Sequence, residues 1–329
     1  MVEQAGLRRR AVRRISALRV RSGVVEQTEQ ESVLVEEPLE IRVSGEPVAT
    51  TLRTPVADRE MALGYLFSEG AIDGLSNIAS VAHCGRPGTP GFGNVIEVTP
   101  GPGLALPEDP LERLRPKALR SSACGACGHA DIMRLAERAS SLVEDTTKLS
   151  ANQVLRCAAK LARTQQFFSA TGGSHAAAVM TPEGRVSAAA EDVGRHNAVD
   201  KVVGSLLLRQ QLPARGQLLV VSSRAGFEIV QKACVAQIPI VVCLSAPTTL
   251  AVETARRTSM TLVGFVRRGG FNVYSGESRL WRGENLVSEP VGPRVAYPRD
   301  AAGNSSFGAA GARHPKGASS SEEEEAWQR

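Results

Sequence analysis

Long apolar runs and dense cysteines are both missing from this chain of 329 residues. No stretch approaches the roughly eighteen apolar residues of a membrane-spanning helix, and no apolar segment follows the N-terminal arginines as it would in a secretory signal. Six cysteines are too few for a secreted domain of this size held together by disulfides. We therefore expect a cytoplasmic protein with reduced thiols and no membrane partner.

The excess of positive charge is confined to one end of the chain. The formal net charge is +5, yet residues 1–21 hold seven arginines and one acid, Glu3, whereas the other 308 residues carry 32 basic and 33 acidic side chains. The body is thus close to neutral, and we expect no nucleic-acid partner. We also expect a poorly ordered basic arm over residues 1–32 and, from its Gly, Ser and Pro content, a disordered tail over 287–329.

Strand-like alternation dominates the first part of the body. Residues 33–120 begin with a hairpin pattern and continue with a helix that Asp58 could cap and that Gly70 ends, which predicts a β-rich N-terminal domain. A stretch rich in Gly and Pro follows, and only residues 94–99 there have the pattern of a strand. Residues 121–149 then hold a C-x-x-C loop and an amphipathic helix.

Strands and helices alternate through residues 150–286. Ser150 is placed to cap a helix, and another helix covers about 196–208. Strand, helix, strand, helix and strand then follow with short connections, which predicts parallel strands covered by helices. The predicted strands cover residues 218–222, 239–244 and 262–266, and the first two hold continuous apolar runs, 218–221 and 238–242, as burial on both faces requires.

The first candidate site is the glycine-flanked cysteine pair Cys124 and Cys127. A zinc site would need two more ligands, and the adjacent His83 and Cys84 make a poor chelating pair. The pattern of a zinc deaminase is incomplete too, because it requires a Glu two residues after the His and a Pro before the first Cys. A thiol-disulfide redox pair and a sulfur carrier both remain open, since each needs a nucleophilic thiolate near a helix N-terminus.

The second candidate site consists of two polar segments that both contain glycine and histidine, 168–178 and 190–201. Backbone N–H groups at the start of the predicted helix, with Arg195 beside them, could bind a phosphate or the edge of a pterin. The alternative is structural: Glu191, Asp192 and Arg195 would form an ion-paired cap, and the histidines would be satisfied core or cap residues.

The third candidate site follows from topology. Ligands of open α/β sheets bind at the carboxyl ends of the parallel strands, where this sequence has hydroxyl side chains, arginines and paired glycines. These groups suit a phosphorylated or nucleotide-bearing ligand, although neither a P-loop nor a G-x-G-x-x-G fingerprint occurs. The segments are Ser222–Arg224, Ser245–Thr249 and a third made of Val266, Arg267, Arg268, Gly269, Gly270 and Phe271.

Several long motifs, found in order between Glu36 and Gly276, resemble those of the FdhD family of formate dehydrogenase accessory sulfur carriers. They are Glu36–Leu39, Ala62–Gly70, Cys124–Gly128, His175–Ala178, Glu191–Lys201, Ser222–Arg224, Thr248–Glu253 and Leu262–Phe265. The resemblance implies a cytidine-deaminase-like three-layer α/β/α domain preceded by a smaller β-rich α+β domain.

The resemblance also implies a function. A cysteine desulfurase would load a persulfide onto Cys124, with Cys127 as its partner in transfer, and this sulfurtransferase would pass the sulfur to a molybdenum or tungsten cofactor. That cofactor, Mo-bis(molybdopterin guanine dinucleotide), would bind at Val266–Phe271 before it enters formate dehydrogenase. The resemblance further implies a homodimer without a tightly bound metal of its own. The rival hypothesis is a cofactor-binding chaperone for formate dehydrogenase, with structural or metal-binding cysteines.

Overall fold

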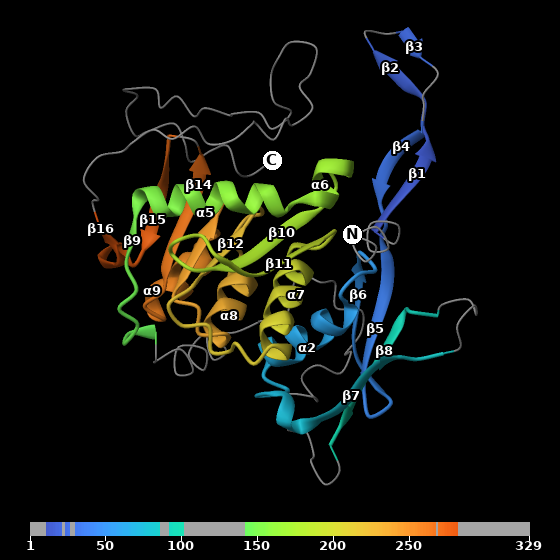
Figure 1. Cartoon of the computed structure of the whole chain (residues 1–329), viewed down its shortest axis with the longest axis horizontal. Helices are drawn as coiled ribbons and strands as arrows, with labels where there is room; N and C mark the ends of the chain where they lie inside the picture. The colour runs from blue at the N-terminus through green and yellow to red at the C-terminus, as the bar shows by residue number, and fades with distance from the viewer. Residues whose placement is uncertain are drawn as a thin grey trace, which may run out of the picture.

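Two β-sheets of different size make up the body of the protein (Figure 1). Both are seen in a computed structural model that describes residues 11–21, 24–26, 30–85, 92–101, 142–267 and 269–281. The predicted C-x-x-C loop and its helix, residue Arg268 and the predicted tail lie outside the described residues.

The larger sheet has six strands in the order β11-β10-β12-β13-β14-β15. Strands β12, β13 and β14 are parallel to one another, and β10, β11 and β15 are antiparallel to their neighbours. The predicted succession of parallel strands and helices is therefore confirmed. The strands are β10 (His175–Met180), β11 (Val186–Asp192), β12 (Leu218–Val221), β13 (Ile240–Cys243), β14 (Thr261–Arg267) and β15 (Gly270–Ser275).

Helices cover both faces of this sheet, so the larger unit has three layers (Figure 1). Alternate residues of the buried strands face opposite layers: Leu218 and Val220 pack with α5 (Ala151–Thr164), whereas Leu219 and Val221 pack with the helices of the other face. Those helices are α7 (Arg195–Leu208), α8 (Phe227–Val235) and α9 (Thr249–Arg257), and the short α6 (Gln166–Thr171) follows α5. The expected likeness to cytidine deaminases goes beyond this layering and stays a prediction.

The start of α5 bears out the sequence pattern in detail. Ser150 Oγ accepts a hydrogen bond from Gln153 N, and Gln153 Oε1 accepts one from Ser150 N, which is a complete capping box. Ser150 also belongs to β9 (Leu149–Ser150), which pairs with β16 (Leu280–Trp281) in a small separate sheet.

The smaller sheet has the order β6-β5-β8-β7 and packs with α2 (Asp58–Glu69). Its strands are β5 (Glu37–Val43), β6 (Glu46–Arg53), β7 (Ile78–His83) and β8 (Val95–Pro100), with η1 (Leu75–Asn77) before β7. The predicted hairpin is β5 with β6, and Gly70 ends α2 in the left-handed conformation as expected. The predicted cap is wrong: Ala57 occupies that position, and the Asp58 carboxylate binds the buried Arg53 guanidinium at 2.9 and 3.0 Å.

Strands also occur in the basic arm, where we expected poor order. β1 (Val12–Ser16) pairs with β4 (Gln30–Leu34), and β2 (Arg19–Arg21) pairs with β3 (Val24–Glu26), forming a ribbon that reaches away from the body (Figure 1). Arg13, Arg14 and Arg19 occupy exposed positions of this ribbon, and Leu34 lies near Gly173, after α6. Among the described helices, none is long and apolar enough to cross a membrane.

Helices α2 and α7 join the two units through a backbone contact at two glycines. A Cβ atom at Gly64 would lie 1.9 Å from the carbonyl oxygen of Asp200, and one at Gly204 would lie 1.8 Å from that of Glu60. No side chain fits between backbones this close, so these helices can pack only where both carry glycine.

Replacing Gly204 by alanine should therefore destabilise the protein, although alanine favours helices. We expect Gly204→Ala to lower the free energy of unfolding by at least about 2 kcal/mol, since the helices must separate and their core must repack. Chemical denaturation measures this. Gly74→Ala is the control, because its added Cβ meets nothing within 4 Å; equal stability of the two variants would contradict the close crossing.

Candidate functional site

The three segments of the third candidate meet at one edge of the larger sheet. β12, β13 and β14 run in the same direction, so the residues that follow them emerge together. Hydrogen bonds join the segments: Ala225 N donates to Ala246 O at 3.2 Å, and Phe265 N donates to Ser245 O at 3.0 Å. α7, α8 and α9 begin at this edge, which we call the carboxyl edge.

The residues predicted to bind the cofactor differ in their surroundings. Val266 is buried, and Phe271 is half-buried against the α5 layer. The Arg267 guanidinium already donates to the backbone oxygens of Leu244 and Val266, which fixes it across the strand ends. A Cβ atom at Gly269 or at Gly270 would meet nothing within 4 Å, so this turn is open to close approach by a ligand.

Phe265 is a residue of this edge that the sequence analysis did not select. Its φ is +53°, which bulky side chains rarely adopt, and its side chain is 43% exposed. Backbone strain of this kind concentrates at binding sites, and an exposed aromatic ring offers a surface for a planar group. In the sequence, Phe265 looks like an ordinary residue of an apolar strand, so no local signal distinguished it.

The second candidate site lies at the same edge. His175 begins β10 directly opposite Asp192, at the end of β10 that pairs with the end of β12. Burial, followed by the charge of Arg195, lowers the pKa of His175, with further contributions from His196 and Arg224. Charges of the second candidate and of the segment after β12 therefore both act on His175 at this edge.

Asp192 is the buried acid around which this cluster is built. Its carboxylate accepts hydrogen bonds from Thr54 N at 3.1 Å, Gly194 N at 2.7 Å and Asn197 Nδ2 at 2.9 Å, and it pairs with the buried Lys201. A charge at zero exposure is stable only with such a set of donors.

The carboxylates of the neighbouring acids also have hydrogen-bond or ion-pair partners. Glu191 accepts from the backbone N of Phe167 and Phe168, at 2.7 and 2.8 Å, and from Ser174 Oγ at 2.6 Å. The ion-paired cap considered above is therefore not what the structure has: within the described residues, neither Glu191 nor Asp192 pairs with Arg195. Glu228 pairs with His196 at 2.6 Å instead, and although burial raises its pKa, His196 holds that pKa below the usual value.

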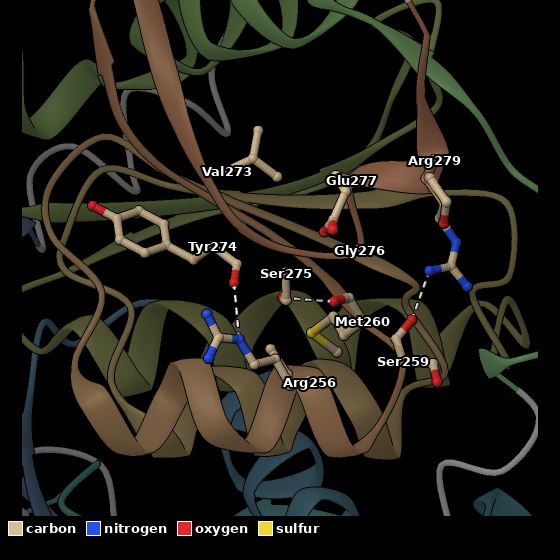
Figure 2. A pocket seen from close by; sticks show the side chains of 11 residues that line it. Arg256, Ser259, Met260, Val273, Tyr274, Ser275, Gly276, Glu277 and Arg279 are labelled. Atoms are coloured by element: carbon tan, nitrogen blue, oxygen red, sulfur yellow. Dashed lines mark hydrogen bonds between the residues drawn. The ribbon is translucent and has the colours of Figure 1, made fainter.

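A cavity of about 640 Å³ lies at the opposite edge of the sheet, near the start of β14, and touches none of the predicted site residues (Figure 2). Arg279, 8% exposed, donates from Nη1 to Ser259 O at 2.6 Å. The same guanidinium binds the carbonyl oxygens of Leu142 and Asp145. Arg279 thus fastens the chain that follows residues 102–141 to the loop before β14, a structural role that accounts for its burial.

The three buried cysteines among the described residues are poor nucleophiles. Burial raises the pKa of Cys157 to about 11, of Cys234 to about 12 and of Cys243 to about 11, so these thiols stay protonated at neutral pH, in agreement with a packing role. Cys84 is half-buried. Cys124 and Cys127, the predicted catalytic pair, lie outside the described residues.

The comparisons with known proteins agree on one family. Residues 34–281 match the family model described as the FdhD/NarQ family, which is most of the chain. This chain belongs to the FdhD/NarQ family. The "Sulfur carrier protein FdhD" of Anaeromyxobacter sp. (strain K) is 48% identical over 260 residues, which cover 77% of this FdhD/NarQ chain and 90% of that protein. The protein of the same name from Streptomyces coelicolor is 39% identical over 275 residues, covering 82% and 96%.

A solved structure shares the fold of this FdhD/NarQ protein. It is a crystal structure from Desulfotalea psychrophila, assigned as a formate dehydrogenase accessory protein. The two superpose with a TM-score of 0.63, over 82% of this chain and all of the other, at 23% sequence identity. The resemblance of the sequence to the FdhD family is therefore confirmed, and the arrangement of both sheets in one chain has a solved counterpart.

Loss of the Arg279 guanidinium should destabilise the protein more than loss of its exposed neighbour. Arg279→Met leaves the carbonyl oxygens of Leu142, Asp145 and Ser259 without their donor, and we expect a loss of about 2–4 kcal/mol in unfolding free energy. Arg256→Met is the control, because the exposed Arg256 guanidinium makes one hydrogen bond to the described residues, to Tyr274 O at 3.2 Å. Equal losses, measured by denaturation, would exclude this role of Arg279.

The charge of Arg195 should be visible in the titration of His175. Arg195→Gln removes the largest charge effect on this ring, so its pKa should rise, as measured by NMR of the imidazole. The lowered pKa also sets a sign for stability: the unfolded chain binds the proton first, so stability should fall as pH drops below about 6.5. An unchanged pKa in Arg195→Gln would contradict the proximity of the two side chains.

Proposed function

We propose that this protein is a sulfur carrier that accepts sulfur on Cys124 and delivers it to a client cofactor of formate dehydrogenase. The observation that supports the proposal best is membership of the FdhD/NarQ family, whose relatives named "Sulfur carrier protein FdhD" match over most of their length. The chemistry of the cysteines agrees with this role. The raised pKa values of the three buried thiols keep them protonated, so they are poor sulfur acceptors, whereas the C-x-x-C pair is the motif suited to a reactive thiolate.

Loading begins with a persulfide donor, for which we propose a cysteine desulfurase. The Cys124 thiolate attacks the terminal sulfur of the donor persulfide, a new S–S bond forms at Cys124, and the donor's own S–S bond breaks to release its cysteine thiolate. This exchange needs no external oxidant or reductant. Cys127, three residues away, is the partner that supports transfer from Cys124.

Delivery takes place at the carboxyl edge, where we place the cofactor, Mo-bis(molybdopterin guanine dinucleotide), against Val266–Phe271. The open turn at Gly269 and Gly270 and the exposed ring of Phe265 support this location. The terminal sulfur is at oxidation level zero, so its arrival as a sulfido ligand oxidises the metal by two electrons and returns Cys124 as a thiolate. The protein then acts as a cytoplasmic sulfurtransferase, in the form of a homodimer, with formate dehydrogenase as its client.

Replacement of Cys124 tests the proposal directly. After incubation with a desulfurase and cysteine, the wild-type peptide 124–127 should gain about 32 Da, the mass of one sulfur atom, and Cys124→Ala should neither gain it nor activate formate dehydrogenase. Mass spectrometry and the dehydrogenase assay measure these results. Cys84→Ala is the control and should keep both properties.

The rival hypothesis, a cofactor-binding chaperone with structural cysteines, predicts the opposite. Under it, Cys124→Ala would still activate formate dehydrogenase, and the wild-type peptide would carry no added sulfur. That result would exclude the sulfur carrier.

A further inference from the structure

The ribbon of the basic arm has an open edge. It reaches away from the body (Figure 1) and lies almost wholly before residue 34, where the match to the family model begins. Within the described residues β1 pairs with β4 alone, so the other edge of β1 presents backbone N–H and C=O groups without a strand partner. A ribbon of two strands is marginally stable in water, which makes this edge suited to a third strand.

The side chains of β1 give this edge a positive charge on both faces. Arg13 and Arg14 are exposed, and among the described residues neither has an ion pair or a side-chain hydrogen bond. Successive side chains of a strand point to opposite faces, so one arginine lies on each face of the ribbon. Ile15, on the same face as Arg13, is 50% exposed. A segment beside β1 would therefore meet a guanidinium group on either face and an aliphatic side chain on one.

The charge of these two arginines is not balanced inside the ribbon. Glu31, the acid of β4, pairs with Arg19 of β2. The remainder of the chain beyond the first 21 residues is close to neutral, with 32 basic and 33 acidic side chains. The complement of this edge is thus an extended acidic segment, because opposite charges on neighbouring strands stabilise a sheet.

The chain itself contains such a segment. Glu322–Glu325 is its longest run of acidic residues, and Trp327 follows two positions later. Like the ribbon, this run lies outside residues 34–281, which match the family. Residues 282–321 connect it to the last described residue, and 40 residues can span roughly 130 Å when extended. That reach exceeds the width of a domain of about 250 residues, which is roughly 45–50 Å.

We propose that residues 322–327 add a third strand to the open edge of β1 in the same chain. Alternate glutamates of that strand point to opposite faces of the ribbon, so two of them meet the face of Arg13 and two meet the face of Arg14. Trp327 supplies an aromatic ring for the exposed aliphatic surface. The contact neutralises the positive charge of the arm within the chain, and it does not depend on sulfur transfer.

Hydrogen exchange of the β1 amides tests the added strand in the full-length protein. Replacement of Glu322–Glu325 by four glutamines gives a neutral-tail variant, in which these amides should exchange about tenfold faster than in the wild type, because the edge reopens. Glu284→Gln/Glu289→Gln/Asp300→Asn is the matched control: it removes three acids from the same tail outside the run, and should exchange as the wild type does. Equal rates in the wild type and the neutral-tail variant would overturn the proposal.

Binding of the isolated segment tests the role of the two arginines. A fluorescently labelled synthetic peptide of residues 318–329 should bind the neutral-tail variant, and the dissociation constant should rise about tenfold when Arg13→Gln and Arg14→Gln are added. Arg156→Gln/Arg163→Gln is the control, because it removes two exposed arginines from α5 and should leave the affinity unchanged. The same affinity with and without Arg13 and Arg14 would overturn the proposal.

Dilution distinguishes a contact within one chain from a contact between two copies. Exchange of the wild-type β1 amides should stay the same over about a hundredfold dilution, since the run and the ribbon belong to one chain. Exchange that becomes faster on dilution would assign the acidic run to a second copy and overturn the contact within the chain.

Discussion

The buried carboxylate of Asp192 is the constraint on which the rest of the structure depends. It ends β11 at zero exposure, and a charge there is stable only because Lys201 and donors from three other residues surround it. One of these donors is Thr54 N in the smaller unit, and Lys201 Nζ also binds Thr54 O at 3.0 Å. The same pair therefore fixes the start of α7 and holds the two units together.

This arrangement has two consequences for the carboxyl edge. The position of α7 is also set by its backbone contact with α2 at Gly204 and Gly64, so the smaller unit cannot shift without displacing the N-terminus of α7. Among the described residues, Asp192 forms its ion pair with Lys201 and not with Arg195. The Arg195 charge instead acts on His175 and Glu228 at the carboxyl edge.

The sequence was sufficient for elements whose signals are local. Continuous apolar runs predicted β12 and β13, the alternation of strands and helices predicted β14, and Ser150 marked the start of α5. The predicted parallel order of these strands then placed the three segments that follow them at one edge of the sheet. The sequence could not show that Asp58 binds Arg53 instead of capping α2, because that choice depends on a partner in another element.

Long-range pairing also explains what was missed at the site. The alternative of an ion-paired cap at Arg195 failed because Lys201, six residues further along α7, and Thr54, from the smaller unit, bind Asp192 instead. Phe265 gave no signal because its positive φ is imposed by a bulge between β14 and β15. The resemblance to a family supplied the roles of Cys124 and Cys127, which lie outside the described residues.

The central claim is that one sulfur atom moves from Cys124 to a cofactor bound at the carboxyl edge. A chase with radiolabelled sulfur tests it most directly: the protein is loaded from labelled cysteine through a desulfurase, freed of donor and mixed with formate dehydrogenase that holds unsulfurated cofactor. The account predicts that label leaves Cys124 and is recovered with the extracted cofactor, in step with the gain of dehydrogenase activity. Label that stays on the protein while activity appears would contradict it.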